Sequence, residues 1–246
     1  TEIGRKIREA FKPQHADWSY LAADYSQIEL RLLAHLSEDP ALISAFKANE
    51  DIHTFTASLI FGIPIEEVTR EQRHQAKAVN FGINYGQQAY GLSQELKIDT
   101  KTAATFIHMY FQRYAKVKHF IETCKEKARQ TGKAVTIMGR ERLIPEINSP
   151  NAMIRTAAER LAINMPIQGS QADIIKLAML EINRRLIEEK RKSFMVLQIH
   201  DELIFEVPNK EIDAISHLVR EVMENIMPLK VPLTVDIHVG KNWKEC

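Results

Sequence analysis

The sequence is short of cysteine, of glycine and of long apolar runs. Its 246 residues include two cysteines and nine glycines. Two cysteines, Cys124 and Cys246, cannot build a disulfide framework or a cysteine-rich zinc site, which favours a reducing compartment. No run reaches the ~18 apolar residues that a membrane-spanning helix needs. We therefore expect a cytoplasmic protein without a membrane partner.

The overall composition is that of an ordinary globular protein, but its charge is unevenly distributed. Hydrophobic residues make up 45% and charged residues 26%, with a net charge of +1. Residues 101–142 carry ten Lys and Arg against three Asp and Glu, whereas residues 195–246 carry five against nine. This asymmetry fits either a polyanion track beside a cation site or two solvated faces of opposite sign.

The apolar pattern predicts an α+β fold whose small antiparallel sheet is split in the sequence. One strand is expected at 18–24 and the others at 195–199, 203–207 and 233–239. The residues between are mostly helical in pattern, with a small hairpin of 135–138 and 142–144. Helices are expected at 28–36, 152–164, 171–190 and 212–226, and the second of these should stop before Pro166.

Acidic residues stand at the ends of these strands. Asp24 ends the first strand, and Asp201 and Glu202 lie at the tip between two later ones. If the strands share a sheet, Asp24 and Asp201 converge at its edge, where paired carboxylates suit Mg²⁺. Two such ions about 3.5–4 Å apart serve phosphoryl displacement. A plain solvated turn is the alternative for Asp201, although the tip lacks the glycine typical of tight hairpins.

Two cations and two aromatic residues recur every fourth position. Arg73, Lys77, Phe81 and Tyr85 fall within about 120° on one face of a predicted helix. Cations neutralise phosphates and rings stack on bases, so the order fits a ligand with phosphates at one end and a base at the other. Packing in the core is the alternative for Phe81.

Glu29 has a structural alternative of its own. Ser26-x-x-Glu29 forms a capping box, in which the carboxylate only returns a hydrogen bond to the helix start.

Three separated segments resemble motifs A, B and C of the family A DNA polymerases. They are Asp24-Tyr-Ser-Gln-Ile-Glu-Leu-Arg31, Arg73-x3-Lys77-x3-Phe81-Gly-x2-Tyr85-Gly86 and His200-Asp-Glu202. Gln168-Gly-Ser170 with Asp173-Ile-Ile-Lys176 also fits, and the resemblance runs in the right order over essentially the whole chain.

The resemblance implies roles for individual residues. It implies that Asp24 and Asp201 bind two Mg²⁺ ions, that Glu202 supports them, and that Lys77 also acts as an acid for departing pyrophosphate. It implies nucleotide contacts from Glu29, His53, Arg73, Lys77, Phe81 and Tyr85. It implies DNA contacts from Arg160, Asn164, Gln168 and His200. For His53, a helix-start histidine without function is the alternative.

The resemblance also implies a right-hand polymerase architecture. Residues 1–45 and 151–246 would form the palm and residues 46–150 the mostly helical fingers. The chain begins with Thr, so we expect a fragment that lacks the family's thumb and upstream domains and is monomeric as part of a longer chain. The implied function is DNA-directed DNA polymerisation in replication and repair, with primer-template DNA and dNTPs as partners in the bacterial cytosol or nucleoid.

Three other functions are distinguishable from this one. A metal-dependent nuclease could use the same carboxylates but has no need of the residues from Arg73 to Tyr85. A non-catalytic DNA-binding module needs the basic region but not Asp24 and Asp201. A single-subunit RNA polymerase is disfavoured by Glu29, because a carboxylate there crowds and repels a ribose 2′-hydroxyl.

Overall fold

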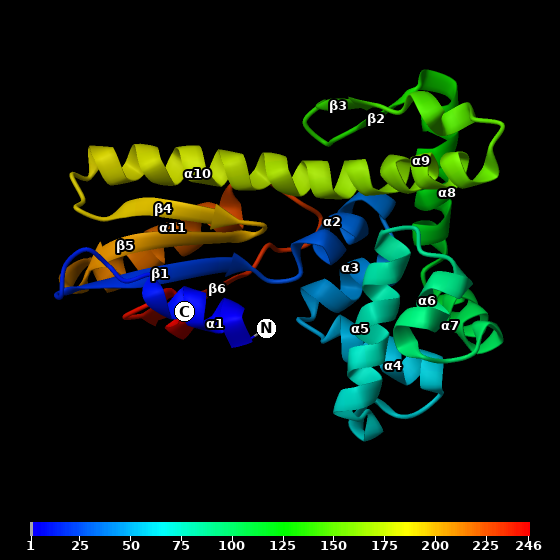
Figure 1. Ribbon diagram of the computed structural model, residues 1–246, viewed down its shortest axis with the longest axis horizontal. Helices are drawn as coiled ribbons and strands as arrows, with labels where there is room; N and C mark the ends of the chain where they lie inside the picture. The colour runs from blue at the N-terminus through cyan, green and yellow to red at the C-terminus, as the bar shows by residue number, and fades with distance from the viewer. Residues whose placement is uncertain (1) are drawn as a thin grey trace. The chain divides into compact units, whose positions relative to one another are not determined.

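The computed structural model describes residues 2–246, which pack as two compact units (Figure 1). The sheet unit contains the chain up to residue 28 together with 171–228 and 233–246, and the helical unit contains 29–170 and 229–232. These units are defined by packing. The palm and fingers boundaries at 45/46 and 150/151 come from the resemblance to the polymerase family, not from packing, and they stay a prediction.

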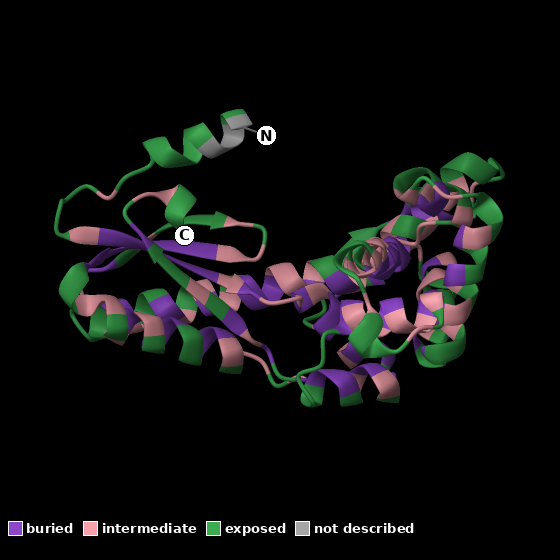
Figure 2. Ribbon diagram, turned by 90° about the horizontal axis from the view of Figure 1, so that it is seen from below, coloured by how far each residue is buried: buried purple, intermediate pink, exposed green. Residues whose placement is uncertain are grey.

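A four-stranded antiparallel sheet, in the order β4-β5-β1-β6, forms the centre of the sheet unit. Its strands are β1 (Trp18–Tyr25), β4 (Phe194–Ile199), β5 (Glu202–Pro208) and β6 (Val235–Gly240). β1 pairs with β5 on one side and β6 on the other, and both inner strands are mostly buried (Figure 2). The predicted α+β class and the sequence-split sheet are therefore confirmed.

The two faces of this sheet have different neighbours. Tyr25 donates a hydrogen bond of 2.7 Å from its hydroxyl to the carbonyl of Met223 in α11 (Ile212–Asn225), so the odd-numbered side chains of β1 face that helix. On the even-numbered face, Tyr20 and Ala22 pack with Ile204 of β5 and with Trp243. Asp24 belongs to the even-numbered face by the same alternation.

Helical segments complete the sheet unit. They are α1 (Glu2–Ala10), most of α10 (Ser170–Glu188), α11, and the short turns η4 (Asn209–Glu211) and η5 (Trp243–Glu245). The amphipathic pattern of α11 is the expected one, because Ile215, Val219 and Val222 are buried at helical spacing.

The helical unit consists mainly of α-helices. Its long helices are α2 (Ile28–Ser37), α3 (Pro40–Lys47), α4 (Ile52–Phe61), α5 (Arg70–Asn84), α6 (Ala89–Leu96), α7 (Thr100–Arg113), α8 (Ala115–Thr131) and α9 (Ala152–Asn164). Its shorter elements are η1 (Ile65–Glu67), β2 (Lys133–Val135), β3 (Glu141–Leu143), η2 (Pro145–Asn148) and the π-helical turn η3 (Met165–Gly169).

The predicted hairpin is displaced from its expected position. Its strands are β2 and β3 instead of 135–138 and 142–144. Thr136 already begins the turn, because its amide donates to the carbonyl of Arg140 and its carbonyl accepts from Gly139. The amide of Ile137 donates to the hydroxyl of Ser170, so this apolar residue belongs to a turn and not to a strand.

The expected helix stop before Pro166 is confirmed, but the chain does not leave the helical path there. α9 ends at Asn164 as predicted, but the chain continues through η3 directly into α10. A π turn skips the regular hydrogen-bond spacing and so accepts a residue that has no N–H to donate.

Candidate active site

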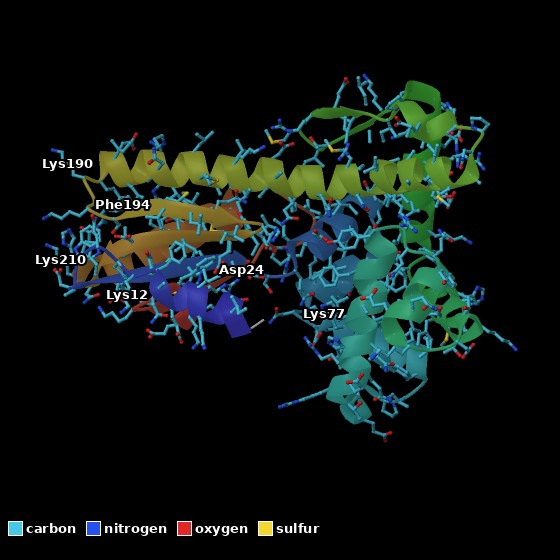
Figure 3. All side chains as sticks on the ribbon, in the orientation of Figure 1. Lys12, Asp24, Lys77, Lys190, Phe194 and Lys210 are labelled. Carbon is cyan, nitrogen blue, oxygen red and sulfur yellow. The ribbon has the colours of Figure 1, made fainter. Side chains whose placement is uncertain are left out.

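Four carboxylates gather at one end of the sheet. Asp24, at the end of β1 in Figure 3, is the register partner of Glu202 on β5 and of Asp236 on β6. The amide of Tyr25 donates to the carbonyl of Asp201 at 3.3 Å, which ties the tip between β4 and β5 to the end of β1. The predicted convergence of Asp24 and Asp201 on one sheet edge is therefore present.

This arrangement is electrostatically unfavourable for Asp24. Burial, followed by the charges of Asp201, Glu202 and Asp236, raises the pKa of Asp24 to about 6. Burial likewise raises the pKa values of Asp201 and Glu202. The buried Oδ1 of Asp24 has no hydrogen-bond partner within residues 2–246. A buried, unpartnered oxygen among carboxylates is a position where a cation would be stabilised.

The donor set fits a hard divalent cation that keeps other ligands. Among the residues the structure describes, no group of three or more His, Cys, Asp or Glu side chains could hold a metal ion. Asp24 and its neighbour Asp201 are two carboxylates at this edge. Mg²⁺ is commonly bound in this way, by one or two carboxylates plus substrate phosphates and water.

The tip that carries Asp201 is held without glycine. His200 adopts φ of 53°, in the left-handed region that non-glycine residues seldom occupy, and its carbonyl accepts from the side-chain amide of Gln198 at 2.7 Å. Backbone strain of this kind is concentrated at functional sites. Gln27, Glu38, Asn49, Lys97 and Lys190 share this φ region, so the role of Asp201 stays a prediction.

In the helical unit, α5 presents the predicted face of cations and rings. Thr69 and Gln72 form a capping box at the start of the helix, and Ala76, Val79 and Ile83 are buried. Arg73, Lys77, Phe81 and Tyr85 stay partly or fully exposed; Figure 3 labels Lys77 on this helix. The Phe81 and Tyr85 rings lie 6.5 Å apart and nearly parallel, and the ammonium of Lys77 is 5.9 Å from the Phe81 ring centre. Phe81 is therefore not a core residue.

Glu29 is bound to the aromatic end of this face. The hydroxyl of Tyr85 donates to both carboxylate oxygens of Glu29, at 2.8 and 3.1 Å. These hydrogen bonds position Glu29 beside α5. They are compatible with a capping role of Glu29 at the start of α2.

A cavity of about 350 Å³ is lined by residues of both α5 and α9. Phe81 and Tyr85 line it together with Arg160 and Asn164, and the buried Oδ1 of Asn164 has no partner within the described residues. A Cβ on Gly86, whose φ is +66°, would lie 2.9 Å from the Ile163 side chain, so the close approach needs glycine. Gln168, on η3, does not line this cavity but is exposed.

Sequence reasoning assigns no role to three polar residues near α5, which are Asp51, Thr56 and Asn80. Asp51 caps α4 and binds the Arg73 guanidinium at 2.6 Å. Asn80 and Thr56 are buried beside His53. In the sequence, Asn80 is marked only as a polar residue on the otherwise apolar face of a helix.

Nearly the whole chain matches one protein family. Residues 1–245 match the family model described as DNA polymerase family A. The chain therefore belongs to the family A DNA polymerases. Within the residues described, no helix is long and apolar enough to cross a membrane.

Curated relatives are DNA polymerase I from several bacteria. The chain is 52% identical over 242 residues to that of Bacillus caldotenax and equally to that of Bacillus subtilis (strain 168), covering 98% of this chain and 28% of each relative. It is 47% identical over 243 residues to that of Mycobacterium tuberculosis (strain H37Rv), covering 99% and 27%. The chain thus spans less than a third of these relatives.

A solved structure is similar over the full chain. It is the POL domain of Pol1 from M. smegmatis in complex with DNA primer-template and dNTP. The TM-score is 0.94 at 46% identity, and the match covers 100% of this chain and 43% of the other.

Proposed function

We propose that this chain is the palm and fingers part of a DNA-directed DNA polymerase that adds dNTPs to a primer 3′-hydroxyl. The observation that carries the proposal is the likeness of this chain, at 46% identity, to 43% of a chain solved with DNA primer-template and dNTP. Replication and repair are the proposed context, in the bacterial cytosol or nucleoid, and the chain is proposed to act as part of a monomeric longer protein.

The sheet-edge carboxylates are the proposed metal ligands. Asp24 and Asp201 would hold two Mg²⁺ ions, with Glu202 as the supporting carboxylate. When bound, these ions would lower the pKa of the primer hydroxyl and neutralise developing phosphate charge. The raised pKa and unpartnered oxygen of Asp24 support this assignment, since a carboxylate held for a cation is poorly stabilised without one.

The residues of α5 are proposed to bind the nucleotide. Arg73 and Lys77 would bind the triphosphate with His53, and the Nζ of Lys77 would donate a proton to departing pyrophosphate. Phe81 and Tyr85 would stack on the sugar and base. Their order along the helix, cations at the first half and stacked rings at the second, supports this polarity.

Two further groups complete the assignment. Glu29 would exclude a ribose 2′-hydroxyl, and its hydrogen bonds from Tyr85 support a fixed position beside the sugar. Arg160, Asn164, Gln168 and His200 would contact primer-template DNA. The cavity that Arg160 and Asn164 share with Phe81 and Tyr85 supports a base-pair contact for these two.

A chimera tests the proposal in a complete enzyme. This chain would replace the matching 28% of Bacillus subtilis DNA polymerase I, and primer extension would be measured with and without Mg²⁺. We expect Mg²⁺-dependent extension with all four dNTPs. Asp24→Asn should abolish it, whereas Asp17→Asn, at an exposed carboxylate of the sheet unit, should not. A folded chimera that degrades the primer or only binds DNA would overturn the proposal.

A further inference from the structure

His53 and Asn80 form a buried polar pair between α4 and α5. Both are almost fully buried, at 3% and 0% exposure. The Nδ2 of Asn80 lies 2.9 Å from the Nδ1 of His53. The hydroxyl of Thr56 donates to the Oδ1 of Asn80 at 3.1 Å, so one amide connects a hydroxyl to an imidazole.

The chemistry of the amide determines where the imidazole carries its proton. An amide nitrogen only donates and an amide oxygen only accepts. In the structure the Oδ1 of Asn80 faces the Thr56 hydroxyl and its NH₂ group faces the ring. Because an amide NH₂ only donates, Nδ1 of His53 accepts in this arrangement. A neutral imidazole has one protonated nitrogen, so the proton lies on Nε2.

The surroundings of His53 also oppose a second proton. A proton on Nδ1 would face the N–H of Asn80, donor against donor. Burial lowers the pKa of His53 to about 4; the cations Arg73 and Lys77 of α5 act in the same direction and Asp51, the cap of α4, in the opposite one. The ring also packs 5.9 Å from that of Phe81. His53 is thus neutral at working pH.

We propose that Asn80 is a positioning residue that fixes His53 as the Nε2–H tautomer, a neutral donor to a triphosphate oxygen. The phosphate part rests on the proposed function; the tautomer does not. Arg73 and Lys77 supply charge, and a neutral N–H beside them adds a directed hydrogen bond without a further buried charge. Nucleotide affinity should then show no histidine titration near pH 6.5.

The tautomer is measured without any activity. The two ring nitrogens of ¹⁵N-histidine in the full 246-residue chain report protonation separately by NMR, and His53→Gln assigns the signal. We expect an Nε2–H resonance from pH 6 to 9. A proton on Nδ1, or a titration in this range, would overturn the proposal even if the chimera polymerises normally.

The consequence for nucleotide binding is tested in the chimera by reversing the hydrogen bond between residue 80 and His53. In Asn80→Asp, the carboxylate still accepts from Thr56 but now also accepts from Nδ1, which moves the neutral proton off Nε2 and raises the pKa of His53. The KM for dNTP should be pH-independent in the parent. In the variant it should rise about tenfold or more from pH 6 to 9, the size of a lost hydrogen bond to a charged group.

The matched control removes the titrating ring. His53→Gln retains an amide donor, so the double variant His53→Gln with Asn80→Asp should show no such pH dependence, and kcat should change less than KM throughout. A flat KM profile in Asn80→Asp would overturn the proposal, as would an equal rise in the double variant. A chimera without any extension would instead contradict the proposed function, while the NMR result would still decide the tautomer.

Discussion

Asp24→Asn should stabilise the sheet unit while it abolishes catalysis. The pKa of Asp24 rises from 3.8 to about 6 on folding. Each unit corresponds to about 1.36 kcal/mol, so the upper bound on the cost of ionised Asp24 is about 3 kcal/mol. The site is partly open to solvent, which screens this energy, and about 1–2 kcal/mol is the expected gain in unfolding free energy at pH 7.

The pH dependence of this gain follows from the sign of the shift. Below pH 3.8 the carboxyl is protonated in both states and costs nothing. As pH rises to about 6 the unfolded chain ionises first, so stability is lost through this window and stays lower above it. Asp201 and Glu202 have raised pKa values too. The difference between parent and Asp24→Asn therefore reports Asp24 together with its repulsion of Asp201, Glu202 and Asp236.

The assay uses the two tryptophans of the chain. Trp18 and Trp243 both belong to the sheet unit, so urea unfolding followed by their fluorescence reports on that unit. The gain should appear between pH 4 and 6. Millimolar Mg²⁺ should stabilise the parent above pH 6, because it binds the native state, but not the variant. A variant less stable than the parent at pH 7, or one equally stabilised by Mg²⁺, would refute the reasoning; Asp17→Asn serves as the charge control.

Three further substitutions test other parts of the molecule. Asp201→Asn should abolish extension by the chimera with DNA affinity, measured by anisotropy, within a few-fold; near-normal turnover would make it a turn residue. Glu29→Ala should admit ribonucleotides far more readily in single-nucleotide incorporation, and Tyr85→Phe to a smaller extent, whereas unchanged selectivity with lower stability would support capping alone. Gly169→Ala should cost about 1–3 kcal/mol in thermal melts, because its Cβ would lie 2.5 Å from Cγ2 of Thr136; no measurable loss would contradict this.

Local patterns predicted the sheet because its inner strands obey simple rules. β1 and β5 are buried along most of their length and so appear as apolar runs, and α11 shows a clean helical stripe. The carboxylates at the strand ends were equally visible, because a charge directly after an apolar strand is conspicuous. The pattern does not single out Asp236, because it alternates with apolar residues as any half-buried strand residue does.

The missed features depend on contacts between distant segments. The turn at Thr136 is set by hydrogen bonds that include Ser170, far along the chain, and no local pattern contains them. The role of Asn80 likewise depends on another segment. Asn80 occupies a core position on α5, and its hydrogen-bond partners both come from α4. These residues could not be predicted from local patterns, because their hydrogen-bond partners lie far away in the sequence.

The π turn η3 introduces a fixed rotation between α9 and Ser170. A regular α-helix advances about 100° per residue, so one surplus residue in the turn rotates Ser170 by that angle relative to α9. The face of α9 that carries Arg160 and Asn164 is thereby set out of phase with Ser170, whose hydroxyl accepts from Ile137 and donates to the carbonyl of Pro166. Removal of a single residue from η3 would leave helix content intact yet turn this hydroxyl away, so that the β2–β3 hairpin would lose its anchor while the helix survived.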